Sequence, residues 1–274
     1  MPSTSGIYRV LGNRLLLVLA ALFAVAAASW IYLLAGAGTG MSTFAMTSWQ
    51  MAIGSERALS RAVATPVDWT GSYAFTMFIM WWVMMIAMML PSAAPIILLH
   101  AKIRGAEGHT LASYNFVAGY LLAWGSFSVA AVSLQWLFEK SGLLSPYMMN
   151  TSSNLFAAAI LLFAGAYQLS PLKRSCLRHC QGPLGFLTHH WKSGKWGAVR
   201  MGFHHGIFCL GCCAGLMAIL FFGGIMNLYW IAGLALLVLA EKLLPLQAKI
   251  PWLSGTVFVV WGLSFLWRAV DSSG

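Results

Sequence analysis

The chain has 274 residues, of which 60% are hydrophobic and only 8% charged. Soluble globular proteins usually carry about 25% charged residues, so this composition excludes that class. We expect an all-α polytopic bundle, a single integral membrane domain over residues 1–274 that contacts lipid. Lys and Arg number 16 against 6 acidic residues, but they lie between apolar runs, where they signal topology. Nucleic-acid binding is therefore not expected.

The first two membrane spans are predicted at Leu15 to Ala37 and Tyr73 to Leu99, because both runs are apolar and long enough to cross a bilayer. Between them, residues 38–72 form the longest polar excursion in this half of the chain. We expect this segment to be extracytoplasmic and to include an interfacial helix from Ser42 to Ala64.

Four methionines in the second span follow one another at spacings of 3, 4 and 4 residues, which places them on one face of a helix. Methionine is a flexible core filler, and that alone explains such a stripe. Thioethers also bind soft metals such as Cu(I), which is the alternative interpretation. Pro91 and Pro95 are expected to loosen the end of this helix. The methionine stripe consists of Met77, Met80, Met84 and Met88.

Five further spans are predicted, which makes about seven in total, or six if the first or last helix lies in the membrane interface. The small residues Gly119 and Gly165 should let neighbouring helices approach closely. The predicted spans are Ala112 to Phe138, Ser153 to Leu169, about Val199 to Ile225, Leu228 to Leu244 and Trp252 to Trp267.

Residues 170–200 form the most basic connection of the chain, and we expect a cytoplasmic loop that carries a metal-ligand motif. Ser170 and Pro171 suit the N-cap and first position of a short helix. Cys176, His179 and Cys180 then share one face of that helix, at i, i+3 and i+4. This spacing fits two or three ligands, although structural zinc and unligated thiols are alternatives.

Soft donors are most concentrated between residues 201 and 217, in the run MGFHHGIFCLGCCAGLM. A helix through this run aligns most of them along one face. Thiolates, thioethers and imidazole suit Cu(I), and to a lesser degree Zn(II). The alternative is that the cysteines are small buried hydrophobes and the paired histidines mark a helix end. The candidate ligands are Met201, His204, His205, Cys209, Cys212 and Cys213.

Glu241 lies at the rim of the sixth predicted span, where a carboxylate is costly unless it is paired. It is therefore a candidate functional residue, although an ion pair with Lys242 or another basic group explains it equally well.

The distribution of basic residues predicts the orientation. With the N-terminus in the cytoplasm, the inner segments hold twelve Lys and Arg and the outer segments four. The positive-inside rule favours this arrangement in a bacterial inner membrane. It places residues 38–72 outside and the Cys176 motif near the cytoplasmic side.

Four motifs resemble a bacterial family of predicted metal-binding integral membrane proteins. They are WWVMMIAMMLPSAAP, SPLKRSCLRHCQGPLGFL, GAVRMGFHHGIFCLGCC and AEKLLP. That family is a domain of unknown function associated with copper chaperones for copper oxidases of the tyrosinase type. The resemblance implies copper handling, and Gln181 stands where the family pattern leads us to expect arginine.

We therefore expect a non-enzymatic protein that binds Cu(I), as a chaperone or transfer protein for a copper enzyme, with zinc as the weaker alternative. Its partners would be a copper-receiving enzyme or a soluble copper donor. Two alternatives stay open. One is a membrane thiol oxidoreductase that uses Cys209 and Cys212, and the other is a non-catalytic accessory subunit of a membrane copper enzyme. The oligomeric state does not follow from the sequence.

Overall fold

The computed structural model describes residues 4–38, 47, 68–106, 111–145, 149–244 and 249–271. Within these residues the chain is all-α, as predicted, and forms nine helices. They are α1 (Thr4–Leu34), α5 (Gly71–Ala106), α6 (Leu111–Lys140), α7 (Asn154–Leu169), α8 (Pro171–Gln181), α9 (Pro183–His190), α10 (Gly194–Gly223), α11 (Leu228–Leu243) and α12 (Lys249–Asp271).

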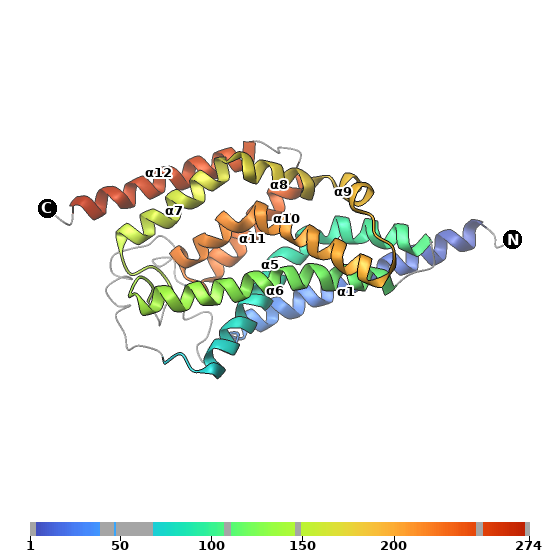
Figure 1. Ribbon diagram of the computed structural model, residues 1–274, viewed down its shortest axis with the longest axis horizontal. Coiled ribbons are helices and arrows are strands. Elements are labelled where there is room, and N and C mark those ends of the chain that lie inside the picture. Colours follow the sequence, from blue (N-terminus) through green and yellow to red (C-terminus); the bar gives the residue numbers. More distant parts are fainter. Residues whose placement is uncertain are drawn as a thin grey trace.

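Helix α10 is the centre of the bundle and packs against α6, α7, α8 and α11. Figure 1 shows α12 alongside α7 on one side of the molecule and α1 alongside α5 on the other. The N-terminal end of the chain lies at the same end of the bundle as α9, whereas the C-terminal end lies at the opposite end (Figure 1). The soft donors of α10 therefore lie on the most enclosed helix.

Glycines allow α10 to approach α6 closely. A Cβ added at Gly202 would overlap the Phe116 carbonyl, and one added at Gly119 would overlap the Val199 carbonyl. Gly165 has the same role between α7 and α12, since its added Cβ would lie 2.9 Å from the Gly255 carbonyl oxygen. The sequence-based expectation for Gly119 and Gly165 is confirmed. The close contacts at Gly119 and Gly202 thus bring the backbones of α6 and α10 together.

The described part of the chain does not show the seven predicted membrane spans, and six was the alternative given by the sequence. Five helices there are long and apolar enough to cross a membrane, namely α1, α5, α6, α10 and α12, and α7 with α8 makes a sixth if that bent pair is one span. Helices α7 and α11 have only 16 residues each. At 1.5 Å per residue such a helix is about 24 Å long, shorter than the hydrocarbon core of about 30 Å.

Two other local expectations had different outcomes. Ser170 caps α8 by accepting a hydrogen bond from the Lys173 amide, and Pro171 is the first helical residue, as predicted. Pro91 and Pro95, in contrast, do not end or break α5, which continues to Ala106. Both prolines are exposed on the outside of the helix, where their rings do not disturb the packed face.

The two predicted loop segments also differ. Residues 170–200 are mostly helical, in α8, α9 and the start of α10. Most of residues 38–72, with the expected interfacial helix from Ser42 to Ala64, lies outside the described residues.

Candidate metal centre

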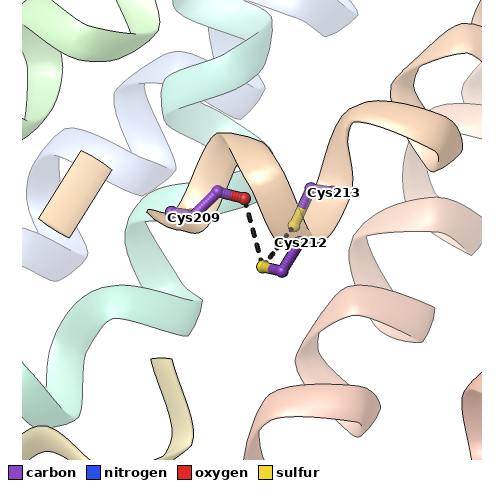
Figure 2. Close-up of side chains that lie close together, drawn as sticks. All are labelled: Cys209, Cys212 and Cys213. Carbon is purple, nitrogen blue, oxygen red and sulfur yellow. Dashed lines mark hydrogen bonds between the residues drawn. The ribbon is translucent and has the colours of Figure 1, made fainter. Parts of the chain in front are cut away.

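Three cysteines of α10 form the centre of the candidate site. Cys209, Cys212 and Cys213 occupy positions i, i+3 and i+4, so one turn of the helix brings them together. Their sulfurs all lie within 4.8 Å of one another, and the Cys212 and Cys213 sulfurs are 3.3 Å apart. Figure 2 shows this contact and the hydrogen bond of the Cys212 thiol to the Cys209 carbonyl. All three side chains are at most 1% exposed.

Helix α8 brings a fourth sulfur to this group. The Cys180 sulfur lies 3.8 Å from that of Cys212. Cys176, one turn earlier on α8, packs instead on Gly211, where an added Cβ would come within 2.6 Å of its sulfur. All five cysteines are free thiols. We call Cys180, Cys209, Cys212 and Cys213 the thiol cluster.

The spacing of the thiol cluster suits a thiolate-bound metal ion. Around an ion with metal–sulfur distances of about 2.3 Å, trigonal or tetrahedral geometry places the sulfurs about 3.8 to 4.0 Å apart. The distances within the cluster lie close to that value, so small side-chain rotations are enough to close it around an ion.

Two polar side chains from other helices contact the Cys209 sulfur, and a third contacts one of those two. The Lys242 ammonium on α11 donates hydrogen bonds to the Cys209 sulfur at 2.9 Å and to the Ser92 hydroxyl at 3.0 Å. The Tyr120 hydroxyl on α6 lies 3.2 Å from the same sulfur and donates to the Met89 carbonyl at 3.1 Å. The ammonium is a fixed positive charge beside a group that becomes negative when it binds metal. Sequence reasoning missed this role for Lys242, Tyr120 and Ser92.

His205 lies one turn before Cys209 and is 2% exposed. Its ring stacks against Tyr120, and within the described part of the chain its Nδ1 has no hydrogen-bond partner. A buried imidazole nitrogen without a partner is costly, and a metal ion is one group that would satisfy it. A cavity of about 200 Å³ is lined by His205, Cys180, Lys242 and Ser92, among others. The thiol cluster is therefore reached from a small polar cavity.

Glu241 belongs to a different network. Its carboxylate makes an ion pair of 2.6 Å with the Lys173 ammonium and accepts a hydrogen bond of 2.7 Å from Gln168. Lys173 also contacts the Gln168 side-chain oxygen, and Gln181 donates to the Glu241 carbonyl at 2.6 Å. The partner is thus Lys173, whereas Lys242 points to Cys209. Both carboxylate oxygens are occupied, which explains the burial of Glu241 without a metal.

The methionine stripe faces the interior of the protein. Met77, Met80, Met84 and Met88 are at most 2% exposed. At one end, the Gln135 amide donates to the Met77 sulfur at 3.7 Å. At the other end, Ser92 lies one turn beyond Met88 on the same helix and contacts Lys242. The stripe therefore leads along α5 toward the neighbourhood of Cys209.

The other predicted ligands have different neighbours. His179 stacks on Phe208, and its Nδ1 is hydrogen-bonded to the Ser175 carbonyl. His204 lies beside His190, with ring centroids 4.7 Å apart. The Met201 sulfur accepts a hydrogen bond of 3.2 Å from the Lys192 amide. In the described part of the chain, these three residues thus contact an aromatic ring, a second imidazole and backbone groups.

Comparison with known proteins supports the chemistry of the site. No curated protein and no solved structure matches the chain. A family model described as PpoB2, copper chaperone, matches residues 78–265, about two thirds of the chain. The match includes all four cysteines of the thiol cluster, the methionines from Met80 to Met88, and Lys242. The chain belongs to the PpoB2 copper chaperone family.

Proposed function

We propose that this membrane protein binds Cu(I) in the thiol cluster and transfers it to a copper enzyme. The observation that carries the proposal is the convergence of three buried α10 sulfurs within 4.8 Å, with a fourth sulfur 3.8 Å from Cys212. The family supports a copper-receiving partner and a role other than catalysis. His205, whose Nδ1 has no hydrogen-bond partner among the described residues, would add an imidazole ligand.

Cu(I) fits these donors better than other biological metals. Thiolates and thioethers are soft ligands, whereas magnesium and calcium need oxygen ligands. Four thiols also suit zinc, but the buried thioethers of the methionine stripe have no role at a zinc site. The stripe would serve as a weaker pathway that receives Cu(I), with Met84 and Met88 nearest the thiolates and Met77 at the entrance.

The orientation belongs to the same proposal. If the bent pair of α7 and α8 is the sixth span, eleven of the 16 Lys and Arg would be cytoplasmic with the N-terminus inside a bacterial inner membrane. Reporter fusions at Gly105 and Lys192 should then be active only as cytoplasmic reporters. Activity of periplasmic reporters at both positions would reverse the orientation and the direction of the methionine pathway.

A thiol oxidoreductase is the second candidate, because the Cys212 and Cys213 sulfurs are only 3.3 Å apart. That activity leaves the methionine stripe without a role. It predicts thiols that cycle between free and disulfide states during turnover, whereas a copper carrier predicts thiols protected from alkylation by Cu(I).

Competition binding tests the proposal. Under anaerobic reducing conditions, the purified chain should take one Cu(I) from a chromogenic Cu(I) chelator and should retain it against equimolar Zn(II). Cys209→Ser/Cys212→Ser should lower the affinity by about 100-fold or more, since even changes outside the ligand set cost 10- to 100-fold. Cys176→Ser is the matched control and should bind as the wild type does. Preference for Zn(II), or unchanged binding by the double variant, would refute the proposal.

A further inference from the structure

A pair of histidines lies where α9 meets the first half of α10. His190 and His204 are half-buried, and their ring centroids are 4.7 Å apart at an interplanar angle of 60°. Neither histidine contacts a carboxylate in the described part of the chain. Two neighbouring imidazoles without an acid to bind are better placed as metal ligands than as an ion pair.

The ring of His190 is held in the tautomer that a metal ligand needs. Its Nδ1 lies 3.1 Å from the Phe186 carbonyl oxygen. A carbonyl oxygen only accepts hydrogen bonds, so Nδ1 must carry the proton. In the neutral ring, Nε2 then has a free lone pair. A backbone carbonyl behind one nitrogen is the usual way in which proteins orient a histidine that binds metal through the other.

A thioether lines the same hollow as the two rings. Met201, His190 and His204 line one hollow of about 530 Å³. Among the described residues the Met201 sulfur accepts one hydrogen bond, from the Lys192 amide, which fixes its position in this hollow and leaves it a second lone pair. Two imidazoles and one thioether form a donor set that suits copper and offers nothing to magnesium or calcium.

We propose that His190, His204 and Met201 form a second, weaker Cu(I) site in the hollow between α9 and α10, from which copper exchanges with the thiol cluster. This inference rests on the proposed function of the cluster. All three ligands are neutral when they bind metal, and the cationic Lys192 and Arg200 also line the hollow. Both features weaken the binding of a cation relative to thiolates, as a site of transient occupancy requires.

One aromatic ring separates this site from the deeper one. Phe186 stacks on His190 with centroids 4.8 Å apart and packs edge-to-face on His205 at 5.2 Å. His205 in turn lines the cavity that contains Cys180 and Lys242. A small movement of the Phe186 side chain would therefore connect the histidine pair with His205 and the thiol cluster.

Two measurements with Cu(I) alone test this site. The first follows the rate of Cu(I) uptake from a chelator by stopped flow in His190→Ala/His204→Ala. We expect uptake to be several-fold slower than in the wild type while the final amount bound to the cysteines is unchanged. His189→Ala is the matched control, because this exposed histidine on the same helix does not line the hollow, and it should take up Cu(I) at the wild-type rate.

The second measurement removes the thiol cluster with four Cys→Ser substitutions at positions 180, 209, 212 and 213. This chain should retain one weakly bound Cu(I), and adding His190→Ala/His204→Ala should abolish that binding. Equal uptake rates in the double-histidine variant and the His189→Ala control would overturn the inference, whether or not the four-serine chain folds. Copper binding that depends on the histidines but not on the cysteines would instead contradict the proposed function.

Discussion

Glu241 and Lys242 are neighbours on α11, yet they belong to two buried networks with opposite properties. Glu241 joins Lys173 and Gln168 in an ion-pair network in which each charged group is paired and hydrogen-bonded. Lys242 faces the thiol cluster, where it donates to the Cys209 sulfur and the Ser92 hydroxyl, and where the Nδ1 of His205 has no hydrogen-bond partner among the described residues. A completed network thus holds the helices together, whereas an incomplete one leaves donors available for a ligand.

The largest expected effect comes from breaking the completed network. Lys173→Met leaves Glu241 buried without its cation, and loss of one partner of a buried pair typically costs about 3 to 5 kcal/mol. Thermal unfolding in detergent should therefore begin at a clearly lower temperature. Lys173→Met/Glu241→Leu removes both charges and should recover part of the loss. A single variant as stable as the wild type would show that the ion pair does not stabilise the fold.

Removing the cation of the incomplete network should affect binding more than folding. Lys242→Met removes the cation that contacts both Cys209 and Ser92, and leaves the neutral Tyr120 hydroxyl in contact with the Cys209 sulfur. We expect Cu(I) affinity to fall by about 10- to 100-fold, the usual effect of changing a group that contacts a metal ligand. Chelator competition measures this change, and Lys242→Arg, which retains the positive charge, should retain more of the affinity. Wild-type affinity in Lys242→Met would separate this lysine from the metal site.

The smallest effect is expected in the methionine stripe. Met84→Leu/Met88→Leu conserves side-chain volume, so stability should change by less than about 1.5 kcal/mol for each substitution. Equilibrium affinity at the cysteines should hardly change, but Cu(I) uptake should slow if the thioethers form its pathway. Met85→Leu is the control, since Met85 is equally buried but lies off the stripe. Identical uptake rates in the two variants would reduce the stripe to core packing.

Local patterns predicted much of the fold and part of the site. The spacing of Cys209, Cys212 and Cys213 requires only one helical turn, and the cap at Ser170 requires only its own residue and the next three. The lengths of α7 and α11 were predicted to within one residue, but each helix is too short to cross the hydrocarbon core alone. Seven spans were expected because each of these short apolar runs was counted as a separate span, whereas the described helices provide five, or six with the bent pair of α7 and α8.

Contacts between distant helices could not be predicted in the same way. The docking of α8 on α10 decides that Cys180, and not Cys176, touches Cys212. Glu241 finds its partner 68 residues earlier in the chain. The sequence left two partners open for Glu241, Lys242 or another basic group, and the second is correct because adjacent residues on a helix point in different directions. The burial of Glu241 indicated a partner, although it could not identify Lys173.

X-ray absorption at the copper edge of the Cu(I)-loaded chain tests the central claim most directly. A thiolate site predicts a first shell dominated by sulfur at about 2.3 Å. The number of sulfur neighbours should fall in Cys209→Ser/Cys212→Ser and should stay unchanged in Cys176→Ser. A first shell of nitrogen and oxygen alone in the wild type, or a spectrum that the double cysteine substitution leaves unchanged, would contradict the thiol cluster as the copper site.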